Sequence, residues 1–201
     1  MTARRVLFAT GNPHKVAEVQ GILGGAWEVV PHPADVEETG ETFEENALLK
    51  ARAVAHETGE LTIAEDSGIE IDALGGAPGV HSARWTAEAD WIDRVLRELA
   101  DVPAAQRGCR YVCAAVAVWP ATPAPPGVAM GIGEHELAVR GVVDGHIAPE
   151  PRGTGGFGYD PIMIPVEGDG RTFAEMTAAE KHVLSHRGRA FRDLARHLVD
   201  L

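Results

Sequence analysis

Two acidic residues, Glu65 and Asp66, stand directly before a Ser-Gly pair in the stretch LTIAEDSGIEIDALGGAPG, residues 61–79. The runs LTIA and IEIDAL on either side are typical of strands, and the Asp-Ser-Gly sequence between them is turn chemistry. The sequence therefore predicts a hairpin with carboxylates at its tip. A strand end can hold a carboxylate against a ligand or metal ion, which makes Asp66 a candidate site residue. The alternative is that Asp66 is an ordinary turn residue that bonds its own backbone.

A second source of carboxylates is the acidic loop at residues 35–41, which precedes a helix expected at residues 42–57. Thr42 and Glu45 fit a capping box, so Glu45 already has a structural role. Glu37 and Glu38 have none. Either is a candidate partner of Asp66 at a metal site, and the alternative is that both are solvated loop charges.

The sequence TGNPHK, residues 10–15, lies between a strand expected at residues 4–9 and a helix expected at residues 16–23. Asn12 can cap this helix, and Pro13 suits its first position because proline lacks the N–H that would be unpaired there. A helix N-terminus offers amide groups and a favourable dipole to an anion, and Lys15 adds a full positive charge. The two common phosphate-binding fingerprints are absent, so the alternative is an ordinary strand-to-helix turn.

Charge and composition limit the possible partners. The formal net charge of −12 argues against a non-specific nucleic-acid binder, which needs a basic surface. Of the 18 basic residues only three are lysines, Lys15, Lys50 and Lys181. A chain that otherwise uses arginine can keep lysine where a compact ammonium is required, so these three positions point to sites of interest.

A glycine-rich segment, GTGGFGYDP at residues 153–161, surrounds two aromatic residues, Phe157 and Tyr159. Glycines let the backbone approach a ligand closely, and exposed rings of this kind can stack on a nucleobase. The alternative is a tight loop in which Phe157 covers the core.

The C-terminal segment begins with a second capping box, Thr177 with Glu180. In one straight helix of ~100° per residue, Lys181, His186 and Arg187 cannot point at one place. Either the helix breaks near residues 185–188, or these side chains contact different parts of an extended ligand. The spacing of His182 and His186 suits zinc, but no third ligand accompanies them.

Length and patterning indicate one domain spanning residues 1–201. Helical and strand-like segments alternate, which is typical of an α/β fold, with further elements expected as a helix at residues 88–100, a strand at residues 109–119 and a strand or hairpin at residues 128–143. Residues 120–127 form a proline-rich surface loop by composition. Cys109 and Cys113 are expected to be buried core residues. No run is long and apolar enough for a membrane span or a signal peptide, so we expect a soluble, cytoplasmic protein.

Five motifs taken together resemble a known family. TGNPHK, FEENALLKA, EDSGIEIDALGGAPGVHSAR, GTGGFGYDP and EKHVLSHRG occur in this order between residues 10 and 188. They are similar to those of the inosine triphosphate pyrophosphatases, also described as dITP/XTP pyrophosphatases. The sequence departs from the usual family pattern at Glu65, where aspartate is common, and at Trp85, where tyrosine is common.

The resemblance implies an elongated α/β fold with a mixed sheet, flanking helices and two lobes around a nucleotide groove. It also implies a homodimer that uses Mg²⁺ to hydrolyse ITP, dITP and XTP to the monophosphate and pyrophosphate. The alternative is a non-catalytic module that senses purine nucleotides, which would need neither Asp66 nor a metal.

By position, the resemblance assigns Asp66 as the catalytic base and a metal ligand, with Glu37 as the second metal ligand unless Glu38 takes that place. The residues implied to contact the substrate are Thr10, Gly11, Asn12, Pro13, His14, Lys15, Ser67, Phe157, Gly158, Tyr159, Asp160, Lys181, His186 and Arg187.

Overall fold

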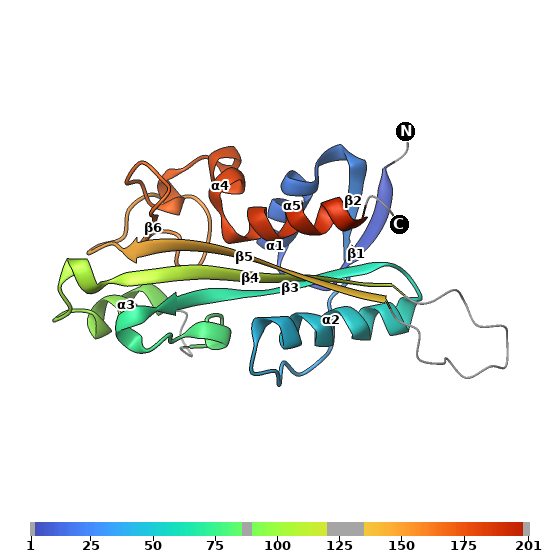
Figure 1. Cartoon of the computed structure of the whole chain (residues 1–201), viewed down its shortest axis with the longest axis horizontal. Helices are drawn as coiled ribbons and strands as arrows, with labels where there is room; N and C mark the ends of the chain where they lie inside the picture. Colours follow the sequence, from blue (N-terminus) through green and yellow to red (C-terminus); the bar gives the residue numbers. More distant parts are fainter. Residues whose placement is uncertain (1–2, 86–89, 120–134, 199–201) are drawn as a thin grey trace, which may run out of the picture. The chain divides into compact units, whose positions relative to one another are not determined.

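The computed structural model describes residues 3–85, 90–119 and 135–198, and it contains one mixed sheet with helices packed against it (Figure 1). The expected mixed sheet with flanking helices is confirmed. The strand order is β2-β1-β3-β4-β5-β6; β1 is parallel to β2 and β3, and β5 is antiparallel to β6. The expected proline-rich loop at residues 120–127 and the start of the expected strand at residues 128–143 lie outside the described residues.

Among the described residues, strands and α-helices alternate as far as β4, and β5, β6, α4 and α5 then follow in that order. The strands are β1 (Arg4–Phe8), β2 (Trp27–Pro31), β3 (Thr62–Ile71), β4 (Gly108–Trp119), β5 (His135–Ile147) and β6 (Met163–Pro165). The helices are α1 (Pro13–Leu23), α2 (Phe43–Thr58), α3 (Trp91–Glu98), α4 (Ala178–Leu184) and α5 (His186–Leu198). The three-residue strand β6 is not anticipated by the sequence, because so short a run carries no periodicity.

The chain divides into two compact units. The first comprises the described residues of Met1–Asp66, Ala114–Val139 and Ala190–Leu201, and the second comprises those of Ser67–Cys113 and Arg140–Arg189. Strands β3, β4 and β5 and helix α5 each contribute residues to both units.

The hairpin expected at residues 61–74 is wrong, because β3 continues as one strand from Thr62 to Ile71 through the Asp-Ser-Gly sequence. Strand β3 lies between β1 and β4 in the sheet order, and its pairing with β1 involves Thr62 and Ile63. A turn at Asp-Ser-Gly would end the strand there, and the continuation of β3 within the sheet outweighs the local preference of these residues for a turn. Gly68 accordingly keeps φ outside the left-handed region. In a continuous strand, Glu65 and Asp66 point to opposite faces of the sheet.

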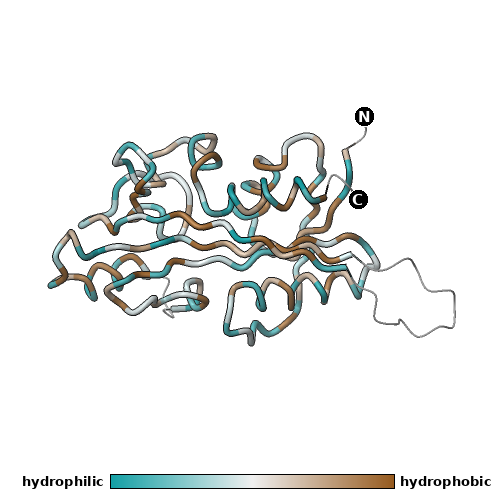
Figure 2. Tube along the Cα trace, in the orientation of Figure 1, coloured by the Kyte–Doolittle hydropathy of each residue, from teal (hydrophilic) through white to brown (hydrophobic). Residues whose placement is uncertain are grey.

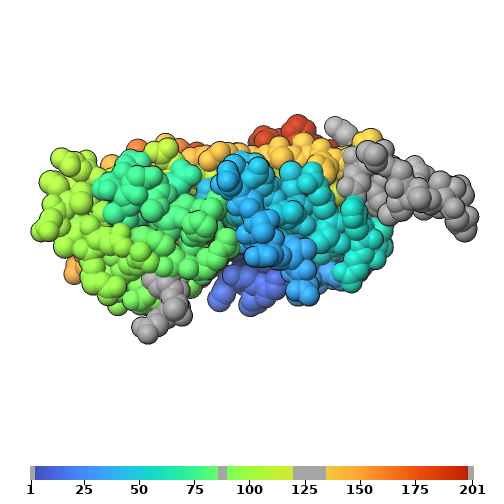
Figure 3. Space-filling model, turned by 90° about the horizontal axis from the view of Figure 1, so that it is seen from below, coloured from blue at the N-terminus to red at the C-terminus, as the bar shows by residue number. Residues whose placement is uncertain are grey.

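The first unit has helices on both faces of its strands. Figure 1 places α2 on one face and α1 and α5 on the other, and Figure 3 shows α2 covering its face of this unit. Three fully buried alanines, Ala47, Ala51 and Ala55, let α2 pack closely against the sheet. On the other face, Phe8 of β1 and Phe191 of α5 make an edge-to-face contact with ring centroids 5.8 Å apart.

The second unit has its own core, and brown and teal segments vary along its strands in Figure 2. It contains Ile69, Ile71, Val95, Leu99, Cys109, Tyr111, Val143, Ile147, Ala148, Tyr159, Ile162, Met163, Phe173 and Met176. Cys109 and Cys113 are buried and neither is in a disulfide, as expected. Burial raises the pKa of Cys109 to about 12, which keeps it a thiol.

The expected helix starts are confirmed. Asn12 caps α1 with Pro13 at its first position, Thr42 and Glu45 form the capping box of α2, and Thr177 and Glu180 form that of α4. No helix in the described part of the chain is long and apolar enough to cross a membrane.

The C-terminal helix breaks near residues 185–188, which is the first of the two alternatives that the sequence leaves open. Helix α4 ends at Leu184, Ser185 is extended with ψ of 153°, and α5 begins at His186. The Ser185 hydroxyl accepts a hydrogen bond from the Gly188 amide at 3.0 Å, which satisfies a donor at the start of α5. Gly188 itself lies inside α5, so the serine marks the break rather than the glycine.

Candidate active site

The loop at residues 10–15 is preformed by its own side chains. The Asn12 Oδ1 atom accepts hydrogen bonds from the amides of His14 at 2.9 Å and Lys15 at 3.4 Å, and the Thr10 hydroxyl accepts one from the Asn12 amide at 3.2 Å. These bonds fix the strand-to-helix turn, so the loop keeps its shape without a ligand.

Lys15 is held by a buried carboxylate. Its ammonium lies 2.8 Å from the Glu65 Oε1 atom, and the Glu65 side chain is fully buried. Glu65 therefore faces the α1 side of the sheet, and it positions the lysine at the N-terminus of that helix.

Asp66 points the other way, toward α2, and is only 7% exposed. Its Oδ2 atom accepts a hydrogen bond from the Asn46 amide group at 3.3 Å, and its Oδ1 atom lies 3.6 Å from the Lys50 ammonium. Sequence analysis points to Lys50 as a position of interest, and the structure pairs it with carboxylates. Asn46 is missed by sequence analysis. Its position one helical turn before Lys50 on the same face of α2 is the signal that could have found it.

The acidic loop brings Glu38 to this cluster. The Glu38 Oε1 atom lies 2.7 Å from the Lys50 ammonium, which is thus shared between Glu38 and Asp66. The loop can approach α2 this closely because residue 40 is glycine: a Cβ there would lie 2.6 Å from that of Glu45. Glu37 is exposed. Of the two glutamates that the sequence leaves open, the geometry favours Glu38.

The pKa of Asp66 is raised above its ordinary value, and the main cause is burial, which penalises the charged form. Lys50 and Lys15 lower this pKa, while the charges of Glu38 and Glu65 raise it further. Burial and the two glutamates outweigh the two lysines. Asp66 is therefore a stronger base than a solvated aspartate.

A divalent cation fits this carboxylate pair. The shared Lys50 ammonium shows that the position between Glu38 and Asp66 attracts positive charge. Among the described residues no three His, Cys, Asp or Glu side chains form a ready-made metal cluster, and His182 with His186 gain no third ligand there. Magnesium ions in proteins commonly use one or two carboxylates together with substrate phosphates and water, so two are sufficient.

In the second unit, a set of side chains is organised by the carboxylate of Asp160, which is 2% exposed. Its Oδ2 atom accepts hydrogen bonds from the Lys181 ammonium at 2.6 Å and the Phe157 amide at 2.8 Å. Its Oδ1 atom accepts one from the Tyr111 hydroxyl at 3.3 Å. Gly156 makes the turn possible, since its φ is 68° and a Cβ there would overlap the Asp160 carboxylate.

The Phe157 ring is half-buried and lies near two cations. The Lys181 ammonium is 4.9 Å from its centroid, and the Arg187 guanidinium carbon is 5.3 Å from it. Arg187 also donates a hydrogen bond to the Ser67 hydroxyl at 3.1 Å. The break at Ser185 is what lets α4 and α5 direct Lys181 and Arg187 to the same ring.

His186 and Tyr159 are placed differently within this unit. The His186 ring stacks on Tyr111 with centroids 4.5 Å apart. Tyr159 lies in the core, where its hydroxyl donates to the Ser82 carbonyl at 2.9 Å, and burial raises its pKa. The structure thus brings together Ser67, Phe157, Asp160, Lys181 and Arg187. His186 stacks on Tyr111, and Tyr159 is buried in the core of this unit.

Comparison with known proteins identifies relatives along nearly the whole chain. The Ham1 family model matches residues 6–197. A dITP/XTP pyrophosphatase of Symbiobacterium thermophilum is 49% identical over 196 residues, which cover 94% of this chain and 92% of its own. One of Streptomyces coelicolor is 44% identical over 202 residues, which cover 94% of each chain.

Solved structures agree with these relatives. The HAM1 protein from Coxiella burnetii superposes with a TM-score of 0.80 at 36% identity, covering 98% of this chain and 100% of its own. A nucleoside-triphosphatase / dITP/XTP pyrophosphatase from Mycobacterium abscessus gives 0.70 at 40% identity, covering 94% and 98%. These matches confirm the resemblance that the five sequence motifs indicate.

Two glycines of the 153–161 loop provide a matched pair for a stability test. Gly158→Ala is expected to lower the free energy of unfolding by about 1–2 kcal/mol, because φ is 63° but no atom lies within 4 Å of the new Cβ. Gly156→Ala adds the clash with Asp160, so we expect a loss of about 2–5 kcal/mol. Urea unfolding followed by circular dichroism measures both. Equal losses in the two variants would show that the contact with Asp160 imposes no constraint.

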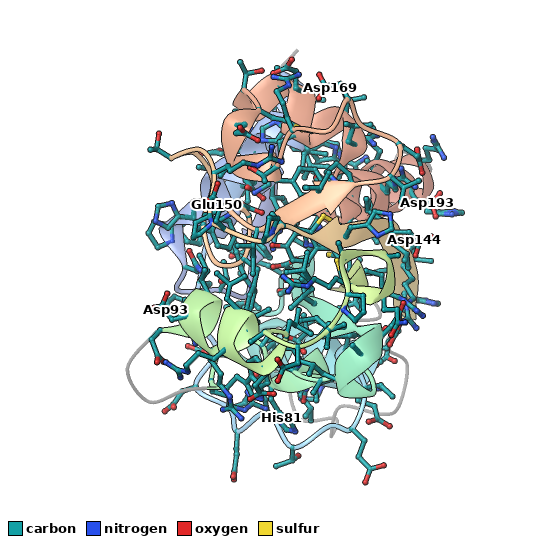
Figure 4. The ribbon with its side chains drawn as sticks, turned by 90° about the vertical axis from the view of Figure 1, so that its left-hand side faces the viewer. His81, Asp93, Asp144, Glu150, Asp169 and Asp193 are labelled. Carbon is teal, nitrogen blue, oxygen red and sulfur yellow. The ribbon has the colours of Figure 1, made fainter. Side chains whose placement is uncertain are left out.

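The pKa of Asp66 predicts a pH-dependent stability. This pKa is raised in the folded protein, so the ionised form of Asp66 destabilises the fold. The contribution of protonated Asp66 to stability is therefore fully present below the unfolded-state pKa and is lost as pH rises through the folded-state pKa. Asp66→Asn should therefore raise the Tm in EDTA at about pH 7.5, and the gain should vanish toward about pH 4. Asp93→Asn, on the exposed side of α3 (Figure 4), is the control expected to show no such trend. A gain independent of pH would contradict the raised pKa.

Proposed function

Because the chain belongs to the Ham1 family, we propose that it hydrolyses the non-standard purine nucleoside triphosphates ITP, dITP and XTP to the monophosphate and pyrophosphate. Its relatives named dITP/XTP pyrophosphatase support this activity. The observation that carries the proposal is a buried aspartate of raised pKa, Asp66, flanked by Lys15 and Lys50 and accompanied by a preformed helix N-terminus. This combination supplies a base together with a binding place for phosphates.

The chemical step is the attack of water on the α-phosphorus. The bond between the α-phosphorus and the oxygen that bridges to the β-phosphate breaks, and pyrophosphate leaves. Asp66 accepts the proton of the attacking water as the general base. Asn46 holds the other carboxylate oxygen by its hydrogen bond and so fixes the orientation of the base.

The phosphates are bound by residues 10–15 and the first turn of α1. The helix dipole and the ammonium of Lys15 offset the negative charge of the triphosphate. Glu65 holds Lys15 at this position before the substrate arrives, so less conformational entropy is lost on binding.

We assign the metal site to Asp66 and Glu38, and the metal to Mg²⁺. When bound, such an ion neutralises phosphate charge and lowers the pKa of water. The carboxylate oxygens of both residues suit it as ligands. Lys50 contacts both carboxylates in this structure.

The base is recognised by the set around Phe157. Stacking on this ring gives affinity for any purine. Lys181, His186 and Arg187 are donors that suit the 6-oxo group of hypoxanthine or xanthine. Adenine has an amino group there and would leave a donor unpaired, which costs ~1–3 kcal/mol. Selectivity against ATP follows from that penalty.

The remaining expectations complete the proposal. Free nucleotides as substrates suit a cytoplasmic enzyme, and the net charge of −12 suits one that does not bind nucleic acid. The homodimer implied by the sequence motifs is testable by light scattering of the purified protein.

Pyrophosphate release from ITP, XTP, dITP, GTP and ATP, with Mg²⁺ and with EDTA, tests the activity. We expect release from the three deaminated substrates, strong preference over ATP and no turnover in EDTA. Asp66→Asn should lower kcat by about 10²–10⁴-fold, because a general base is removed, and should leave nucleotide binding largely intact. Nucleotide binding without release from any purine would instead favour the non-catalytic sensing module.

The two adjacent glutamates give a matched test of the metal site. Glu38→Gln should raise the Mg²⁺ concentration for half-maximal rate by about 10-fold or more, since a ligand is lost. Glu37→Gln changes the same charge one residue away, at an exposed position, and should leave that concentration unchanged. The reverse result would assign the metal to Glu37.

A further inference from the structure

Tyr111 of β4 contacts the base-recognition set, by which we mean Phe157, Asp160, Lys181, His186 and Arg187, although no sequence motif singles it out. It is 5% exposed, and its hydroxyl and its ring each contact a different member of the set. The hydroxyl donates to Asp160, and the ring stacks on His186. All of these contacts lie within the second unit.

The hydroxyl contact matters because the Asp160 carboxylate holds two other groups. Its Oδ2 atom fixes the Lys181 ammonium and the Phe157 amide, while its Oδ1 atom receives the Tyr111 hydroxyl. The Tyr111 hydroxyl on β4 and the Phe157 amide in the glycine-rich loop fix the orientation of the Asp160 carboxylate. That orientation in turn sets the position of the Lys181 ammonium. Asp160 has these three donors around it and is 2% exposed, so it acts on a ligand through Lys181 and Phe157 rather than by contact.

The ring contact fixes an imidazole. The planes of Tyr111 and His186 are inclined by 29° with centroids 4.5 Å apart, while Phe173 stacks with Tyr111 at 5.8 Å and 26°. Tyr111 thereby ties the plane of His186 to the core of the second unit. A histidine that is held in one plane presents its ring nitrogens in fixed directions.

We propose that Tyr111 is a positioning residue that sets purine selectivity, through its hydroxyl on Asp160 and its ring against His186. The inference rests on the proposed function and deepens it, because it names the residue that holds the base-reading donors in place. Rigid donors discriminate between a 6-oxo and a 6-amino group, whereas mobile donors can move away from a mismatched partner.

The protonation state of Tyr111 suits this role. Burial and the neighbouring charge of Asp160 hold the pKa of the phenol well above its ordinary value. The hydroxyl therefore remains a donor throughout the physiological range.

Two variants separate the two contacts. Tyr111→Phe removes the hydroxyl and keeps the ring, and Tyr111→Leu removes both. The measurements are the Kd of IMP and of AMP by calorimetry, kcat and KM for ITP and ATP, and the Tm. In Tyr111→Phe we expect the preference for IMP over AMP to fall about 10-fold, equivalent to ~1.4 kcal/mol, with kcat for ITP changed by less than about 2-fold. In Tyr111→Leu the preference should fall further.

Cys109→Ala is the matched control. Cys109 precedes Tyr111 by two residues on the same face of β4 and lies in the same buried cluster. We expect a lower Tm from the lost volume and an unchanged preference. A merely structural role for Tyr111 would give this pattern in all three variants, and that result would overturn the inference.

The binding measurements keep the two proposals distinguishable. If the wild-type protein prefers IMP over AMP but releases no pyrophosphate, the proposed hydrolysis fails while the effect of Tyr111 on selectivity is still measured. If wild-type binding does not distinguish IMP from AMP, the proposed selectivity and the role of Tyr111 are both overturned.

Discussion

The constraint on which this structure depends is the burial of carboxylates. An ionised carboxylate out of water destabilises a fold unless a positive group accompanies it. The protein uses each of its three lysines for this purpose, in the pairs Lys15 with Glu65, Lys50 with Glu38 and Asp66, and Lys181 with Asp160. Compensation at Asp66 is incomplete, since its pKa remains raised despite two lysines. That residual destabilisation is the same property that makes Asp66 a base.

The choice of lysine over arginine has a physical reason at these positions. An ammonium is compact and can lie between two carboxylates, whereas a guanidinium is a broad planar fork. Arginine instead forms the more exposed ion pairs, such as Arg171 with Asp169 and Glu180. The pKa of Glu180 is lowered to about 2, with its hydrogen bond to Arg171 the largest cause. Solvent screens such exposed pairs, so they add little stability.

Backbone devices place the charged groups. Glycine at position 40 lets the acidic loop approach α2, and glycine at position 156 lets the aromatic loop close over Asp160. Ser185 ends α4 and its hydroxyl caps α5, which turns residues of two helices toward one ring. The site thus depends on three small residues, because larger side chains at 40 and 156 would clash and a residue without a side-chain acceptor would leave the start of α5 unsatisfied.

Local interactions let the sequence alone determine much of this protein. The helix caps at Asn12, Thr42 and Thr177 can be predicted from sequence because each involves residues within one helical turn. The family is likewise identified from sequence alone, because each of its five motifs is a short continuous stretch. The course of β3 was decided only by tertiary structure, because pairing with distant strands outweighs the turn preference of Asp-Ser-Gly. That pairing sends Glu65 and Asp66 to opposite faces, and it is invisible in local sequence. The partners Asn46 and Tyr111 became evident only in three dimensions, since each meets a carboxylate more than 15 residues away in the chain. The sequence names both Glu37 and Glu38 as candidates, and only the tertiary structure favours Glu38.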